Sequence, residues 1–555
     1  MTENNRDAYY DRIKAIVGSQ LTDKALCVYT ASFLGETVEL LASCGITRFS
    51  FEPQSSMWPA IIQRRLTRHN TFEDRWDFSA AENPALILAG WDESVCRAAY
   101  DRARKTSVPL VMGVMLKSGV SLASIVFPGQ PFPWNELALQ SHKEIPTLDT
   151  YLQWIDLQNQ LANIAKAVLL HETSWERQDF NALFAENKTT VLLSHATWPW
   201  MSRYLNTENP QDRQWLKGLL ERIPRVTFER MPYVTPKHCN LRGKTVLVVG
   251  LGSLGSVAAK HLETLGANIV GIDGKEVSLH NPVRQLYATS DIGIPKAFAL
   301  AHILAGKPWE NYKISLDAHE VRFTYGDGDR RMFAAIREEM EDSKAGAARF
   351  NEILDIYTPD LVVFATAHPA EFRMADAARK RGIPHVVGRC YARARWFEVT
   401  SINPAHSPCF GCLQGHLYTG APPSLTEEEL ARYEPQQQIT LVQGEPATRI
   451  ETARCADTIA RMGVELLMPS EDCSEWFRRM MREERNCLIG GNYAEYKNDD
   501  WTYGIESPGG VALYGVINFV GSETEQTKTC LYCARTHEVL IHRRPVKNPA
   551  EERGE

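Results

Sequence analysis

The stretch that decides the fold class is Lys244–Asp273, KTVLVVGLGSLGSVAAKHLETLGANIVGID. An apolar run leads into Gly250-x-Gly252-x-x-Gly255, and an amphipathic stretch and a second apolar run follow. This order predicts a strand, a tight turn, a helix and another strand. The glycines let backbone N–H groups approach a phosphate at the positive end of the helix. Asp273 ends the second predicted strand, where an acid can bind a ribose hydroxyl. The sequence therefore predicts an α/β nucleotide-binding unit.

Two cations follow this unit in the segment GKEVSLHNPVRQLYATSDIGIPKA, which begins directly after Asp273. Arg284 can bind phosphate oxygens through two parallel hydrogen bonds, and Lys296 can act as a point charge. Two cations near a glycine-rich turn suit a triphosphate better than the two phosphates of a dinucleotide. The alternative is a solvated helix face with incidental charges. The pattern favours ATP over NAD.

The first part of the chain repeats the pattern of the second. KALCVYTASFLGETVELLASCGITRFSFEP begins at Lys24, and its Leu34-Gly35 aligns with Leu254-Gly255. A second pair of similar segments begins at Asn83 and Thr358. The repeats predict two tandem α/β units, about 1–230 and 235–535, although any two strand–helix–strand units look somewhat alike.

The repeat predicts a first unit that binds no nucleotide. Thr30 and Ser32 stand where the second unit has Gly250 and Gly252. Their side chains would crowd a phosphate-binding turn.

Four cysteines form two CxxC pairs, Cys409/Cys412 and Cys530/Cys533. Four thiolates with this pairing suit a closed, tetrahedral structural zinc site. Redox chemistry and buried cysteines without a metal are the alternatives. A Trp, Trp134, stands at the corresponding place in the first repeat.

Composition narrows the classes of protein further. The chain has 555 residues, a net charge of −7 and 44% hydrophobic residues. A dedicated nucleic-acid binder would show a basic surplus. No apolar run reaches the roughly 18 to 20 residues of a membrane helix, and the N-terminus MTENNRDAYYDR lacks a signal-peptide pattern. We expect a cytoplasmic protein that binds neither nucleic acid nor membrane.

The ordered series that follows the glycine turn resembles the signature of the ThiF/MoeB/ubiquitin-activating (E1-like) superfamily. The resemblance implies two Rossmann-like adenylation units, a structural zinc ion and an ATP site. The resemblance also implies that an arginine of the other half reaches the phosphates. YYDRIKAIVG resembles the family segment that carries it, so Arg12 matches this arginine, and an exposed surface arginine is the alternative. The residues that it implies for the nucleotide are Gly250, Gly252, Gly255, Asp273, Asn281, Arg284, Gln285 and Lys296, with Asp291-Ile292-Gly293 completing the signature.

The resemblance also implies a domain plan. An inactive half would occupy residues 1–230, and an active ATP-binding half would occupy 235–408. The zinc knuckles, with an inserted crossover loop and catalytic-cysteine region, would cover 409–533, and a tail would cover 534–555. Such a fused chain can act as a monomeric pseudo-dimer.

One segment departs from the family pattern. The family carries an Asp-Asn pair in a segment like VDATDN, and the Asp serves Mg²⁺ and adenylation. Here VVFATAHP places Ala367 and His368 at those positions, and Asp92 occupies the equivalent place in the first unit. Either other acids hold Mg²⁺, with Asp273 or Glu276 helping, or turnover is weak.

The expected nucleophile is Cys455, in GEPATRIETARCADTIARMGVELL. It lies near the predicted start of an amphipathic helix and beside Arg454, and both features lower a thiol pKa. Cys473 is the second candidate. A small buried helix residue is the alternative for Cys455.

The resemblance implies a two-step reaction. ATP would adenylate the C-terminal carboxylate of a ubiquitin-like protein, and a thiol would then form a thioester that passes to a conjugating enzyme. Prokaryotic ubiquitin-like systems, including those in antiphage defence, are the nearest parallel. The alternatives are a sulfur-carrier adenylyltransferase, a non-catalytic ATP-binding scaffold and an NAD-dependent oxidoreductase.

Overall fold

The computed structural model describes the following residues: 21, 24–29, 34–52, 58–70, 76–79, 83–91, 93–115, 120–132, 151–170, 190–195, 198–206, 210–211, 214, 241–306, 318–325, 331–390, 396–404, 409–411, 447–467, 485–491, 515–520, 528–529, 536–537 and 540–542. The predictions for Arg12, Thr30, Ser32, Asp92, Trp134, Cys412, Cys473, Cys530 and Cys533 fall outside these residues.

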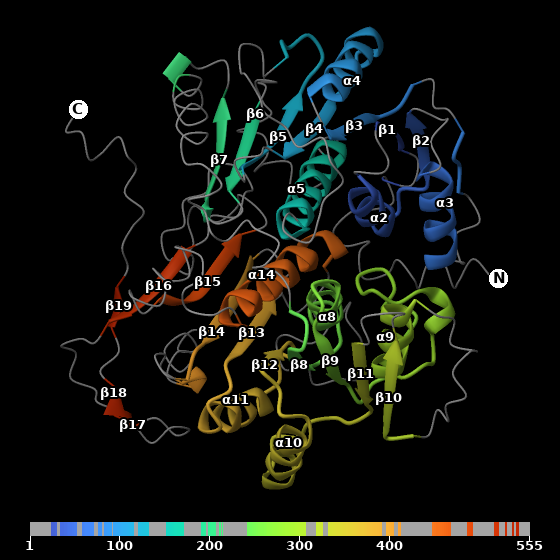
Figure 1. Ribbon diagram of the computed structural model, residues 1–555. Coiled ribbons are helices and arrows are strands. Elements are labelled where there is room, and N and C mark those ends of the chain that lie inside the picture. The colour runs from blue at the N-terminus through green and yellow to red at the C-terminus, as the bar shows by residue number, and fades with distance from the viewer. Residues whose placement is uncertain are drawn as a thin grey trace, which may run out of the picture.

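The first half of the chain contains a seven-stranded sheet in the order β2-β1-β3-β4-β5-β6-β7 (Figure 1). Strands β2, β1, β3 and β4 are parallel, and β5, β6 and β7 continue the sheet antiparallel. The strands are β1 Ala25–Tyr29, β2 Arg48–Glu52, β3 Leu86–Trp91, β4 Leu110–Met115, β5 Val120–Val126, β6 Thr190–His195 and β7 Trp198–Asn206.

The second half contains a ten-stranded sheet in the order β10-β11-β9-β8-β12-β13-β14-β15-β16-β19. Strands β11, β9, β8, β12 and β13 are parallel. The strands are β8 Thr245–Val249, β9 Asn268–Ile272, β10 Glu320–Tyr325, β11 Arg331–Ile336, β12 Leu361–Phe364, β13 His385–Cys390, β14 Trp396–Ile402, β15 Arg485–Gly491, β16 Gly515–Val520 and β19 Leu540–His542. A separate pair joins β17 Lys528–Thr529 to β18 Thr536–His537.

The described helices are α2 Gly35–Ser43, α3 Trp58–His69, α4 Glu93–Thr106, α5 Tyr151–Leu170, α8 Gly255–Thr264, α9 Lys296–Ala305, α10 Lys344–Tyr357, α11 Ala370–Lys380 and α14 Arg449–Leu467, with a short 3-10 helix η5 at Thr289–Asp291. In the described part of the chain, no helix combines the length and apolarity needed to cross a membrane.

The strand order repeats between the two sheets. The order β9-β8-β12-β13-β14-β15-β16 of the second sheet follows the same pattern as the complete order of the first. The prediction of an α/β fold with parallel strands is confirmed. The matching order supports the predicted duplication, and the tandem adenylation units stay a prediction.

The central strands β8 and β12 are mainly apolar because both faces of the sheet are covered. In β8, Val246 and Val248 pack into a core on one face, with α8 and α14. Leu247 and Val249 pack into a core on the other face, with α10 and α11. The period-two alternation of the strand thus feeds two cores, and the C-terminal end of the strand opens onto the site.

Helix α14 lies between the two halves, and Figure 1 shows it between α5 and α8. Ile450 and Ala453 belong to the core of the first half. Cys455 and Ile459 belong to the core of the second half. The helix therefore completes both cores, and the two halves share one structural element.

Buried charges also join the halves. Lys166 of α5 forms an ion pair with Glu451 of α14, and both side chains are buried. Glu36 of α2 lies 3.7 Å from Lys260 and 3.5 Å from Arg449. Burial would raise the pKa of Glu36, but these two cations and Arg65 outweigh it and lower the pKa to about 2. The interface is thus held by charge pairs as well as by apolar packing.

Candidate nucleotide-binding site

A cavity of about 520 Å³ lies at the C-terminal ends of β8, β9, β12 and β13. In open α/β sheets, ligands bind at this edge. The cavity brings together most of the residues predicted to bind the nucleotide: Gly250, Gly252, Asp273, Asn281, Arg284, Gln285 and Lys296. They come from four separate segments, so the fold assembles the set that the sequence predicted.

The glycine turn has no room for side chains at two of its three positions. Gly250 has φ of +86°, and a Cβ there would lie 2.6 Å from Cγ2 of Thr366. A Cβ on Gly255 would lie 1.8 Å from the carbonyl oxygen of Gly250. A Cβ on Gly252 would meet no protein atom within 4 Å. Gly250 and Gly255 therefore serve the turn itself, and Gly252 leaves its face of the cavity open to a ligand.

The carboxylate of Asp273 braces this turn. Its Oδ2 accepts a hydrogen bond from the Leu251 N–H at 2.8 Å, and its Oδ1 accepts one from the Lys275 N–H at 2.9 Å. The buried hydroxyl of Tyr287 donates to the Leu251 carbonyl oxygen at 2.6 Å. Tyr287 was not predicted from the sequence, although it lies within the signature segment. Together these bonds fix the turn before any ligand binds.

Asn281 shapes the segment that carries the cations. Its side-chain oxygen accepts a hydrogen bond from the Ser278 N–H at 3.0 Å. Its carbonyl oxygen accepts from the N–H groups of Arg284 at 3.1 Å and Gln285 at 2.9 Å. Lys296 is the first residue of α9, and its side chain is largely buried. The geometry sets two cations beside the glycine turn, which suits the phosphates of ATP.

Residues of the first half contact the segment that carries Arg284. Nε2 of His69, the last residue of α3, donates to the carbonyl oxygen of Pro282 at 3.0 Å. Val283 is fully buried in the core of the first half. Both contacts lie next to Arg284. The described residues of the first half therefore contact the nucleotide site through its loop.

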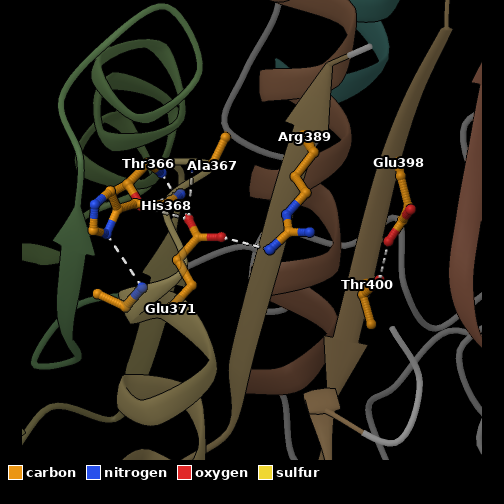
Figure 2. A network of polar contacts seen from close by, with 8 residues as sticks. Thr366, Ala367, His368, Glu371, Arg389, Glu398 and Thr400 are labelled. Atoms are coloured by element: carbon orange, nitrogen blue, oxygen red, sulfur yellow. Dashed lines mark hydrogen bonds and ion pairs between the residues drawn. The ribbon is translucent and has the colours of Figure 1, made fainter. Parts of the chain in front are cut away.

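The loop after β12 carries Ala367 and His368, which stand where the family has an Asp-Asn pair, and it forms one wall of the cavity. Ala367 has φ of +52°, a left-handed conformation. Glu371 is fully buried, and its Oε1 accepts hydrogen bonds from the Thr366 N–H, the Thr366 hydroxyl and the Ala367 N–H at 2.8, 2.8 and 3.0 Å (Figure 2). This carboxylate holds the loop in place from inside the protein.

The other oxygen of Glu371 pairs with Arg389, whose Nη2 lies 2.9 Å from Oε2 (Figure 2). The Arg389 guanidinium lies 4.9 Å from the ring centre of Phe410 and 5.6 Å from that of Phe372. The sequence analysis missed this pair. The sequence offers no local signal for Glu371, because α11 carries several other charged side chains, among them Arg373 and Asp376.

His368 lines the cavity beside this loop. Its Nδ1 accepts a hydrogen bond from the Ala370 N–H at 3.2 Å, at the start of α11 (Figure 2). The backbone N–H of His368 donates to the Thr366 hydroxyl at 3.1 Å. The ring is thus held by its own loop.

The acids around the cavity do not fit the expected magnesium site. Asp273 is bonded to backbone, as described above. Glu276 lies 2.9 Å from Arg337, Glu338 lies 2.9 Å from Arg349, and Glu339 lies 3.9 Å from Lys275. Across the described ranges, no group of three or more His, Cys, Asp or Glu residues is arranged to hold a metal ion. The expectation that Asp273 or Glu276 replaces the family aspartate finds no support in this donor set.

Of the four cysteines predicted to bind zinc, the structure describes Cys409. Cys409 is buried, next to Phe410, and is not in a disulfide. Cys412, Cys530 and Cys533 lie outside the described residues, so the zinc site stays a prediction.

The expectation of a lowered thiol pKa at Cys455 is wrong. Helix α14 begins at Arg449, so Cys455 lies in its second turn. The thiol is fully buried, its Sγ lies 3.8 Å from the Arg389 carbonyl oxygen, and burial raises its pKa well above the ordinary value. The Cys390 thiol adds to that rise. A buried, neutral thiol is a poor nucleophile.

Known proteins resemble parts of this chain. The chain is 31% identical over 209 residues to the sulfur carrier protein adenylyltransferase of Thermus thermophilus, which covers 36% of this chain and 66% of that protein. It is 25% identical over 208 residues to ubiquitin-like modifier-activating enzyme 5 of Drosophila ananassae, covering 37% and 46%. The chain therefore spans just under two thirds of the first relative and under half of the second.

Among solved structures, Escherichia coli MccB with ATP is 12% identical, covers 68% of this chain and 94% of that chain, and has a TM-score of 0.32. Residues 232–437 match the ThiF family. This match contains the glycine turn, Asp273, Arg284 and Lys296, which the structure brings to one cavity. Over residues 232–437, this chain is therefore similar to the ThiF family.

Proposed function

We propose that this chain uses ATP to adenylate the C-terminal carboxylate of a small carrier protein. The observation that carries this proposal is the single cavity that joins the glycine turn to Arg284 and Lys296. The names of two relatives, a sulfur carrier protein adenylyltransferase and a ubiquitin-like modifier-activating enzyme, support a protein carboxylate as the acceptor.

The proposed step is a displacement at phosphorus. A carboxylate oxygen of the carrier attacks the α-phosphorus, and the bond from that phosphorus to the bridging oxygen of the β-phosphate breaks. Pyrophosphate leaves with the electron pair, and an acyl-adenylate forms. Arg284 and Lys296 stabilise the charge on the phosphate oxygens, and the N–H groups of the glycine turn bind phosphate. Asp273 lies where it can bind a ribose hydroxyl.

The second step has two candidate forms. In one, an enzyme thiol attacks the acyl-adenylate, AMP leaves, and the thioester passes to a conjugating enzyme. Its cysteine would be Cys473 or another outside α14, because Cys455 is buried. In the other, hydrosulfide attacks the carbonyl carbon of the acyl-adenylate, AMP leaves with the electron pair, and the carrier becomes a thiocarboxylate. The sulfur-carrier form is favoured by the 31% identity to the Thermus enzyme.

The two halves would act as one unit in this proposal. Arg12 of the first half would reach the phosphates, and the Cys409 knuckle would hold a structural zinc ion with Cys412, Cys530 and Cys533. A role in antiphage defence would follow only from the pathway of the carrier.

The test is ATP–pyrophosphate exchange with purified small carrier proteins that end in an exposed glycine. Wild type should exchange, and Arg284→Ala and Lys296→Ala should lose exchange by 100-fold or more. Arg381→Ala is the matched control, because Arg381 pairs with Asp355 on the surface. A non-reducing gel then separates the two forms of the second step by a thiol-sensitive adduct. ATP binding without exchange for any carrier would overturn the proposal and favour a scaffold.

A further inference from the structure

We propose that the imidazole of His368 binds the α-phosphate as a neutral hydrogen-bond donor, on the wall where the family carries an aspartate for a metal ion. This inference rests on the proposed function. In that function, His368 would contact the reacting phosphate, and no divalent cation would be needed on this wall.

Buried hydrogen bonds and an ion pair fix the loop that carries His368. Glu371 is fully buried, and it accepts the N–H groups of Thr366 and Ala367 (Figure 2). Its negative charge is balanced by Arg389 at 2.9 Å. These backbone N–H groups and this carboxylate therefore bond to one another and to Arg389, within the protein. Of the Thr366–His368 loop, the imidazole is the side chain suited to contacting an anion.

The tautomer of the ring decides which nitrogen can donate. Nδ1 accepts a hydrogen bond from the Ala370 N–H at 3.2 Å, so it carries no proton. In a neutral imidazole, one nitrogen accepts and the other donates. The proton is therefore on Nε2, and the ring presents an N–H donor. Among the described residues, no hydrogen-bond partner is found for this Nε2.

The chemistry of a phosphate ligand matches such a donor. Phosphate oxygens accept hydrogen bonds from a neutral N–H without an intervening ion. A carboxylate at the same place would repel them unless a cation lay between. The acids that line the cavity are bound to Arg337, Arg349, Lys275 or backbone. This donor set suits a phosphate on His368 better than a metal ion on this wall.

The backbone itself could have kept the aspartate. Ala367 has φ of +52°, and Asp and Asn tolerate the left-handed region better than Ala. Ala367→Asp therefore restores the family side chain without adding backbone strain, and this variant tests whether the wall works without an aspartate.

The test is calorimetric titration of the full chain with AMP, in EDTA and again in Mg²⁺. AMP carries the α-phosphate alone, so its binding does not need the ion that accompanies ATP. We expect wild type to bind AMP equally in both buffers. His368→Ala should weaken AMP binding about 10-fold, the value of one hydrogen bond to a charged group. His368→Gln should stay within about 3-fold of wild type, because its amide nitrogen can donate from near the position of Nε2.

Ala367→Asp provides the reverse experiment. It should weaken AMP binding in EDTA about 10-fold by repulsion, and Mg²⁺ should restore it. Arg381→Ala is again the control. Unchanged AMP binding in His368→Ala would overturn the inference and leave the proposed function standing. Equal losses in His368→Ala and His368→Gln would also overturn it, because they would indicate packing rather than donation. Failure of wild type to bind either AMP or ATP would instead refute the proposed function.

Discussion

Nε2 of His69 donates a hydrogen bond to the carbonyl oxygen of Pro282 at 3.0 Å, which ties helix α3 of the first half to the loop that carries Arg284. The next residue, Val283, is buried in the core of the first half. The position of Arg284 in the second half thus depends on a surface that the first half supplies.

The first prediction concerns this contact. His69→Leu should weaken ATP binding, because it removes the donor to Pro282 and loosens the Arg284 loop. The loss of one hydrogen bond to a largely buried carbonyl should also lower the free energy of unfolding by about 1 to 3 kcal/mol. Calorimetric titration with ATP and urea unfolding measure the two effects. Arg68→Ala, one position earlier on the exposed side of α3, should change neither.

The second prediction concerns pH. Burial, reinforced by Lys260, lowers the pKa of His261 from 6.5 to about 3, so the folded protein holds this ring neutral. Below pH 6.5 the unfolded chain binds a proton there that the folded chain does not, and stability falls as pH falls. The loss from this ring between pH 7 and pH 5 should be about 2 kcal/mol.

His261→Asn tests this contribution, since an Asn amide falls near the position of Nδ1 and can still contact the Tyr151 hydroxyl, which lies 2.8 Å from Nδ1. Its urea-unfolding free energy should fall less than that of wild type between pH 7 and pH 5. Glu36, with its pKa of about 2, should stay charged over this range, and its contribution is lost only below about pH 4.5. Identical pH slopes in variant and wild type would contradict the assignment.

The third prediction concerns the buried ion pair of Lys166 and Glu451. Lys166→Met should lower the free energy of unfolding by about 3 to 5 kcal/mol, because it leaves Glu451 charged and buried. Lys166→Met combined with Glu451→Gln should recover most of this loss, since Gln still accepts the Thr448 N–H that lies 2.9 Å from the Glu451 carboxylate. Urea unfolding of the single and double variants measures the coupling. Additive losses would show that the two charges do not interact.

The fourth prediction concerns the backbone of Ala367, whose φ of +52° is unfavourable for a residue with a Cβ. Ala367→Gly should raise the free energy of unfolding by up to about 1 kcal/mol, since Gly adopts this conformation without strain. Ala367→Val should lower it. Thermal unfolding of both variants checks the signs, and a destabilised glycine variant would count against the strain.

Local sequence patterns were enough to predict the glycine turn, Asp273 and Arg284. These residues lie in one continuous stretch, so their spacing can be read directly from the sequence. The Glu371–Arg389 pair could not be predicted in this way, because it forms only when α11 packs on the end of β13. Long-range packing decides such pairs.

Cys455 shows the same limit. The sequence suggested an amphipathic helix with one exposed face, yet residues 449–464 of α14 are buried on all sides by the two halves. One local signal was available. Thr448 and Glu451 have the spacing of a capping box, and the Thr448 N–H donates to the Glu451 carboxylate. That signature starts the helix at Arg449 and places Cys455 well inside it.

The place of α14 in both cores has a consequence for how the protein is made. The first sheet ends at Asn206, but its core also needs Ile450 and Ala453. A ribosome that has finished β7 must therefore continue beyond residue 453 before the first half can close. Until then, the face of α5 that receives α14 stays exposed on the nascent chain. This interval is when a chaperone, or a second copy of the chain, has access to that face.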